Sequence, residues 1–187
     1  MSDTVDLSGH FLMAMPGMVE GDLAGTVIYV CEHSDRGALG LVINRPTDLR
    51  LGSLLEQVDL AKEGDGQPDV PVHFGGPVQS DRGFVLHKPA GQYSSSIHLG
   101  ETLALTTSRD VLQAVASGEG PEKIFITLGY AGWGAGQLEQ ELAQNAWLTV
   151  PAEESIIFEV APESRYPAAM RLLGVDPAML AGSAGHA

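Results

Sequence analysis

The chain has 187 residues, a length that suits one domain with a well-buried core. Its composition, 44% hydrophobic and 18% charged, excludes a disordered tail protein and a fibrous protein. Lys and Arg number 10 against 24 Asp and Glu, and the net charge of -14 repels nucleic-acid phosphates and anionic lipid. We therefore expect no direct nucleic-acid binding.

We expect a cytoplasmic protein that neither spans a membrane nor is exported. Residues 1–6 include two acids and no Lys or Arg, whereas a secretory signal begins with positive charge and continues into an apolar run. The apolar runs are far shorter than the roughly 20 residues needed to cross a bilayer. Cys31 is the only cysteine, so no disulfide forms within the chain, which agrees with a reducing compartment.

Short apolar runs rich in Val, Ile, Leu and Phe predict strands along most of the chain, because each run is bounded by Gly, Pro, Asp or Ser. In chain order the predicted strands are Phe11–Met15, Thr26–Cys31, Gly37–Ile43, Val70–Phe74, Gly83–His87, Thr102–Thr106, Lys123–Leu128 and Ser155–Val160.

Helical periodicity appears in four segments that are intermixed with the strands. In chain order they are Ser53–Leu60, Ser108 to about Gly118, about Ala135 to Gln144, and Arg165–Leu173. The first opens with a capping-box pattern, Ser53-x-x-Glu56, and the second has Ser108 at its N-cap position. The third is amphipathic, with apolar residues on one face.

The tetrapeptide Ser-Asp-Arg-Gly occurs twice, at 34–37 and at 80–83. Ser and Asp bond readily to turn backbone and Gly tolerates positive φ, so the tetrapeptide predicts a hairpin turn at both places. We expect exposed loops at 61–69 and 88–96 and a flexible tail at 182–187, within a single domain that spans 1–187.

Cys31-Glu32-His33, at the end of a predicted strand, is the first candidate for chemistry. Side chains alternate along a strand, so Cys31 and His33 should share one face. Such a pair can begin a zinc site, or the histidine can activate the thiol. Further metal ligands would have to come from His10, His73, His87 or His98. Since a lone cysteine is commonly a small buried hydrophobic residue, we expect no metal and no cofactor, and keep a metal- or thiol-dependent enzyme as the alternative.

Residues 129–136 read Gly-Tyr-Ala-Gly-Trp-Gly-Ala-Gly and lie between a predicted strand and a predicted helix. Phosphate-binding loops are built in this order. The segment lacks the Gly-Lys-Ser/Thr ending of a Walker loop, and Glu139 stands where a dinucleotide fold has glycine. Tight backbone packing around Trp133 is the favoured interpretation, and nucleotide binding at 129–136 stays open as an alternative.

Four of the ten basic residues flank the two predicted hairpins: Arg36, Arg45, Arg82 and Lys88. If the hairpins pack together, these side chains form one positive spot on an acidic protein. A small anionic ligand or an acidic partner segment would bind there; alternatively, each residue pairs with a local acid. The candidate ligand or partner site comprises Arg36, Asn44, Arg45, Arg82, His87, Lys88 and Trp133.

Three blocks of the sequence resemble the YqgE/AlgH family. The first combines 9–16 (GHFLMAMP), 27–33 (VIYVCEH) and 40–46 (GLVINRP). The second combines 75–78 (GGPV) and 82–87 (RGFVLH), and the third 129–133 (GYAGW), 136–139 (GQLE) and 145–148 (NAWL). The blocks follow in order from Gly9 to about Val160, most of the chain.

The resemblance implies an α+β fold in which helices surround a strongly bent, partly barrel-like and mostly antiparallel sheet. It also implies a regulatory association, since the AlgH name derives from alginate production in pseudomonads, but it supplies no catalytic residue. The sequence itself has no Gly-x-Ser-x-Gly elbow, no matched acid pair and no helix-turn-helix signature. We therefore expect a non-catalytic regulator, of transcription as the resemblance implies, that acts through protein or small-ligand binding.

Overall fold

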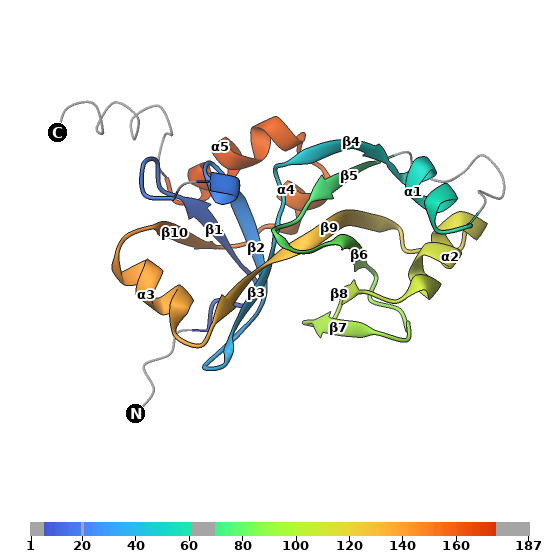
Figure 1. Ribbon diagram of the computed structural model, residues 1–187, viewed down its shortest axis with the longest axis horizontal. Coiled ribbons are helices and arrows are strands. Elements are labelled where there is room, and N and C mark those ends of the chain that lie inside the picture. Colours follow the sequence, from blue (N-terminus) through green and yellow to red (C-terminus); the bar gives the residue numbers. More distant parts are fainter. Residues whose placement is uncertain (1–5, 20, 61–69, 175–187) are drawn as a thin grey trace.

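The computed structural model describes residues 6–19, 21–60 and 70–174. Their strands form one strongly curled sheet with helices packed against it (Figure 1). Among the described strands, the pairing is antiparallel everywhere except between β5 (Pro71–Phe74) and β9 (Lys123–Gly134). The predicted α+β fold with a bent, mostly antiparallel sheet is confirmed.

Neighbouring strands in the sheet follow an order that differs from the chain order. The path runs through β10 (Trp147–Pro151), β1 (His10–Ala14), β2 (Val27–Ser34), β3 (Gly37–Val42), β9, β6 (Val78–Lys88), β8 (Leu103–Thr106) and β7 (Ser96–Leu99), and β4 (Pro46–Arg50) pairs with β5. The turn predicted at 34–37 joins β2 to β3. Gly37 is required there, because it has φ +135° and an added Cβ would lie 2.3 Å from the Trp133 carbonyl oxygen.

Helices cover both faces of the sheet, which explains why several strands are apolar without alternation. On one face, side chains such as Phe11, Leu41 and Phe125 pack with α4 (Glu154–Phe158) and α5 (Pro162–Leu172). On the other face, α3 (Gln137–Ala143) covers a cluster that includes Leu12 and Val30. Further along that face, α1 (Leu51–Gln57) and α2 (Arg109–Ser117) cover a cluster that includes Val85 and Ile126. A short 3-10 helix, Gly21–Leu23, precedes β2.

Strand β9 is a central strand of the sheet and pairs with three others, β3, β5 and β6. Ile126 and Leu128 pack in the α1–α2 cluster, but Tyr130 packs on the opposite face, against the α4–α5 cluster. The alternation of side chains between the two faces of the sheet shifts at Gly129, which has φ +80°. Glycine adopts this conformation without strain.

Two predicted elements were wrong. Residues predicted as the strand Ser155–Val160 form α4 and the turn after it, because a short apolar run does not distinguish a strand from a buried helix. The turn predicted at 80–83 lies inside β6, which passes through it with an irregular register opposite β9 between Val78 and Gly83. This irregular stretch contains the turn residues, and the chain continues through it without reversing direction.

Other elements differ in extent from the predictions. The short strands β4, β7 and β10 were not predicted. Helix α1 begins at Leu51, before the predicted start, so Ser53 lies inside the helix and forms no capping box. The predicted loop at 61–69 and the predicted tail at 182–187 lie outside the described residues. No helix in the described part of the chain is long and apolar enough to cross a bilayer.

Candidate functional site

Cys31 and His33 lie on opposite faces of the sheet, contrary to the prediction that they share one. The register between β2 and β3 shifts between Val30 and Glu32, which places a β-bulge at Cys31. Cys31 packs in the α4–α5 cluster, whereas the His33 ring bonds to residues on the α3 side. The bulge adds one residue to the alternation and so turns His33 to the other face.

The Cys31 thiol is buried in the hydrophobic core. The residue is 2% exposed, and its sulfur has a weak contact with the Tyr29 carbonyl oxygen at 3.9 Å. Burial, and to a smaller extent the charge of Glu32, raises the pKa of the thiol. A thiol with a raised pKa is a poor nucleophile at neutral pH, because the thiolate is the reactive form.

The His33 ring joins the N-terminal segment to α3. Its Nδ1 accepts a hydrogen bond from the Leu7 N–H at 3.0 Å, so the ring proton is on Nε2, which donates to Glu139 Oε1 at 3.0 Å. This bond lowers the pKa of the Glu139 carboxyl. Both ring nitrogens are therefore occupied. Within the described residues, no group of three His, Cys, Asp or Glu side chains is arranged to hold a metal ion.

Two further histidines that were considered as ligands are also held in the fold. His87 is fully buried. Its Nδ1 lies 3.0 Å from the Pro89 carbonyl oxygen, and because a carbonyl only accepts, the ring proton is on Nδ1. Nε2 is then the acceptor for the Thr106 hydroxyl, at 2.7 Å. Burial is the main cause of the lowered pKa of His87. His73 accepts a hydrogen bond from Arg165 at 2.9 Å.

The glycine-rich segment 129–136 is not the loop that the sequence suggested. Residues 129–134 belong to β9, and the helix that follows, α3, has seven residues with Glu139 in its first turn. Its Trp133 is buried, and the indole N–H donates to Glu141 Oε1 at 3.0 Å. Trp147 donates to the same oxygen at 2.9 Å, so Glu141 joins the two indoles. This arrangement agrees with the interpretation that the segment packs tightly around Trp133.

Two of the four basic residues that were considered for one positive spot, Arg36 and Lys88, lie near opposite ends of β9. Lys88 pairs with Lys123, the first residue of β9. Arg36 precedes Gly37, which pairs with Gly134, the last residue of β9. Those ends are separated by roughly 35 Å of extended strand. Lys88 pairs with Glu154 at 2.8 Å, as the alternative of local pairing predicts, but among the described residues Arg36, Arg45 and Arg82 form no ion pair.

Asn44 and Arg45 fix the segment before β2. The Asn44 side chain accepts from the Val27 N–H at 2.9 Å and donates to the Gly25 carbonyl at 3.0 Å. The Arg45 guanidinium donates to the Ala24 carbonyl. These bonds satisfy backbone groups of a turn, so both residues have structural roles.

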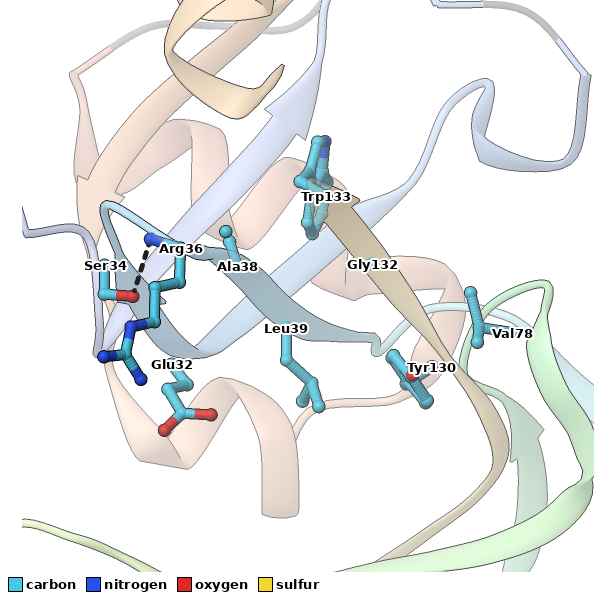
Figure 2. A pocket seen from close by; sticks show the side chains of 10 residues that line it. Glu32, Ser34, Arg36, Ala38, Leu39, Val78, Tyr130, Gly132 and Trp133 are labelled. Atoms are coloured by element: carbon cyan, nitrogen blue, oxygen red, sulfur yellow. Dashed lines mark hydrogen bonds between the residues drawn. The ribbon is translucent and has the colours of Figure 1, made fainter. Parts of the chain in front are cut away.

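Arg36 and Trp133, two of the predicted site residues, line one groove of about 420 Å³. We call it the β3–β9 groove; its other lining residues include Glu32, Leu39, Val78 and Tyr130. Figure 2 shows Arg36, Glu32, Leu39 and Tyr130 in a row along one side of the β2–β3 hairpin and β9. Leu39, Val78 and Tyr130 are half-buried, and Arg36 and Glu32 are exposed at one end. The groove thus combines an apolar floor with charges of both signs.

Sequence reasoning did not single out Glu141 or Arg165, which organise buried polar contacts. Glu141 is one of several polar residues in the predicted third helix, and a solvent-exposed carboxylate has the same pattern. Arg165 is 6% exposed and bonds to atoms that are distant in sequence, including the Ile43 carbonyl oxygen at 2.5 Å. Nothing local in the sequence indicates such contacts.

Comparison with known proteins gives a consistent result. The family model described as AlgH-like matches residues 11–178. The chain is 71% identical over 184 residues to a UPF0301 protein of Bordetella pertussis, covering 98% of this chain and 91% of the relative. It is 56% identical over 183 residues to a UPF0301 protein of Ralstonia nicotianae, covering 98% and 96%.

Two solved structures are similar over nearly the whole chain. The solution structure of AlgH from Pseudomonas aeruginosa is 50% identical, with a TM-score of 0.81 and coverage of 97% of this chain and 96% of that one. A crystal structure of a protein from Corynebacterium diphtheriae is 21% identical, with a TM-score of 0.68 and coverage of 91% and 89%. The second likeness concerns the fold alone.

Proposed function

This chain belongs to the AlgH-like family, and we propose that it is a non-catalytic regulatory protein that acts by binding a protein partner in the β3–β9 groove. The regulatory role is supported by the association that the resemblance to the YqgE/AlgH family implies. The binding role is supported by the groove itself. We further propose a cytoplasmic location, which suits a chain whose single cysteine is a free, buried thiol.

The observation that carries the proposal is the row of half-buried apolar side chains in the groove. Leu39, Val78 and Tyr130 stay partly exposed although they belong to strands whose other apolar side chains are mostly buried. Tyr130 is fixed by an edge-to-face contact with Phe84, with ring centroids 5.4 Å apart. A rigid aromatic ring in an apolar patch with a charged rim is the usual composition of a protein contact site.

The charges at the groove suggest the chemistry of the partner. Among the described residues, no carboxylate lies within ion-pair distance of the Arg36 guanidinium. We propose a partner segment with an acidic side chain beside an apolar one, so that the acid pairs with Arg36 and the apolar group covers Leu39 and Tyr130. Nucleic acid is a poor fit, because a net charge of -14 repels a phosphate backbone.

A thiol- or metal-dependent enzyme is the alternative, and the contacts of its candidate residues weigh against it. Cys31 is buried with a raised pKa, and His33 uses both ring nitrogens in hydrogen bonds. A reaction centred on them would first require that these contacts break.

A charge-matched pair of variants tests the proposal. The full chain and its Arg36→Glu and Arg171→Glu variants would each be used for quantitative affinity capture with cross-linking from cytosol of the source cells. Arg171 is an exposed arginine on α5 and does not line the groove. We expect a partner that cross-links to groove residues, is lost with Arg36→Glu and is retained with Arg171→Glu. Equal capture by the two variants, or no partner that cross-links to the groove, refutes the proposal.

A further inference from the structure

A second pocket lies away from the β3–β9 groove, where α1 and α2 meet β6 and β8. Its volume is about 540 Å³, within the range of pockets that hold small organic molecules. Much of its wall is apolar and comes from the α1–α2 cluster: Leu54, Val58, Val85, Leu112 and Leu128. None of these residues lines the β3–β9 groove. We call it the α1–α2 pocket.

Two arginines line this pocket, and each donates a hydrogen bond to another residue of the lining. Arg82 Nη2 donates to Thr107 Oγ1 at 3.3 Å, and its Nη1 donates to Gln79 Oε1 at 3.2 Å. Arg109 Nη2 donates to the Val58 carbonyl oxygen at 2.5 Å. A guanidinium has five N–H donors, so these contacts leave most donors of both groups available.

The hydrogen-bond partners of both arginines are neutral oxygens, and the Arg82 guanidinium also lies over the Phe84 ring, 5.9 Å from its centroid. Within the part of the chain that the structure describes, no carboxylate lies within ion-pair distance of Arg82 or Arg109. Asp110, next to Arg109, instead accepts from the Ser94 N–H at 2.7 Å and from Ser108 Oγ at 2.5 Å. Its carboxylate is therefore directed to the loop before β7 and is not part of the pocket lining.

The lining has an excess of positive charge. Arg82 and Arg109 contribute two positive charges, and the exposed Asp81 contributes one negative charge. A net charge of +1 at a pocket is notable in a chain whose net charge is -14. Arginine donors without an acidic partner are suited to bind a carboxylate or phosphate through charge-assisted hydrogen bonds.

We propose that the α1–α2 pocket binds a small organic anion that has an apolar body. The carboxylate or phosphate head contacts Arg82 and Arg109 at the exposed rim, with the Thr107 hydroxyl beside it. The apolar body lies against Leu112, Val85 and Leu128. This site goes beyond the proposed partner contact and does not depend on it, because the two sites share no lining residue.

The test uses the full chain and four simple probes: octanoate, octyl phosphate, inorganic phosphate and octanol. Binding is measured by titration calorimetry, and the site is mapped by amide chemical-shift changes. We expect octanoate, octyl phosphate or both to bind and to shift amides of α2 and β8. Inorganic phosphate lacks the apolar body and octanol lacks the charge, so both bind at least tenfold more weakly than the preferred anion. The preferred head group distinguishes a carboxylate ligand from a phosphate ligand.

Charge-removing variants decide the role of the arginines. Arg82→Gln and Arg109→Gln keep hydrogen-bond donors but remove the charge, and each should weaken binding about tenfold. Arg36→Gln in the β3–β9 groove and Arg171→Gln on α5 should leave binding unchanged. An unchanged amide spectrum outside the pocket confirms that each variant is folded. The proposal is overturned if neither octyl anion binds, if octanol binds as well as the anions, or if the Arg82 and Arg109 variants bind like the unchanged chain.

Discussion

Arg165 donates a hydrogen bond from Nη1 to Nε2 of His73, with the two atoms 2.9 Å apart in the interior of the protein. Because Nε2 accepts, the His73 proton is on Nδ1, which is buried without a well-aligned partner. Burial lowers the pKa of Arg165 to about 10, although Glu163 opposes this shift, so the guanidinium is charged at neutral pH. A buried cation and a neutral histidine thus connect α5 to β5.

Replacing Arg165 should destabilise the fold substantially. In Arg165→Met, the backbone carbonyl oxygens of Ile43, Ile156 and Val160 lose a buried donor. We expect a loss of about 3 kcal/mol in the free energy of unfolding, measured by urea denaturation. Arg171→Met, on the exposed side of the same helix, is the control and should change it by about 0.5 kcal/mol or less. Similar losses in the two variants would contradict the role given to Arg165.

Stability should fall at mildly acidic pH because of His73. Burial, followed by the charge of Arg165, lowers the His73 pKa from 6.5 to about 4, with the Pro71 carbonyl offsetting the shift slightly. Between these values the unfolded chain binds a proton that the native chain does not, so the free energy of unfolding decreases as the pH falls from 6.5 to 4. The full shift corresponds to roughly 3 kcal/mol.

The measurement is urea denaturation at several pH values between 4 and 7. His73→Gln keeps an acceptor for Arg165 but does not titrate, so its stability should depend less on pH in this window. His98→Gln, at an exposed position of β7, should retain the pH dependence of the unchanged chain. If the slope is the same with and without His73, another group is responsible.

The Cys31 thiol should be almost inert in the native protein. Its burial and raised pKa predict that iodoacetamide labels it at pH 8 about 100-fold more slowly than an exposed thiol. The comparison is Ser117→Cys in a Cys31→Ala background, since Ser117 is exposed at the end of α2. Labelling is followed by mass spectrometry and should become fast in urea. Comparable native rates would show that the core opens around Cys31.

Glu141 should stabilise the region around the two indoles. Glu141→Ala removes the acceptor that Trp133 and Trp147 share, and we expect a loss of about 2 kcal/mol in the free energy of unfolding. Tryptophan fluorescence during urea denaturation reports both the stability and the indole environment. Gln140→Ala, at the exposed neighbouring position, should behave like the unchanged chain. An unaffected midpoint in Glu141→Ala would mean that the shared acceptor contributes nothing.

The predictions from sequence succeeded where structure is determined locally. The turn at 34–37 formed as predicted, because the strands on either side of it, β2 and β3, pair directly with each other. The same tetrapeptide at 80–83 did not form a hairpin, since β6 pairs with β9, whose paired residues lie 35 or more positions later. Long-range pairing therefore overrode an identical local signal.

The candidate site was predictable only in part, for similar reasons. Arg36 and Trp133 were identified from the sequence, and they do line one groove. The separation of Cys31 from His33 was not predictable, because it results from a single inserted residue in the register of β2. Arg109 was not identified as a ligand-binding residue, since its place in a pocket depends on how α2 packs beside β6.

The shift of side-chain direction at Gly129 gives the two proposed sites a shared backbone. Leu128 lines the α1–α2 pocket and Tyr130 lines the β3–β9 groove. Only Gly129 lies between these two lining residues in the chain. Molecules bound in the two proposed sites would therefore contact side chains that are two positions apart on one strand and on opposite faces of the sheet.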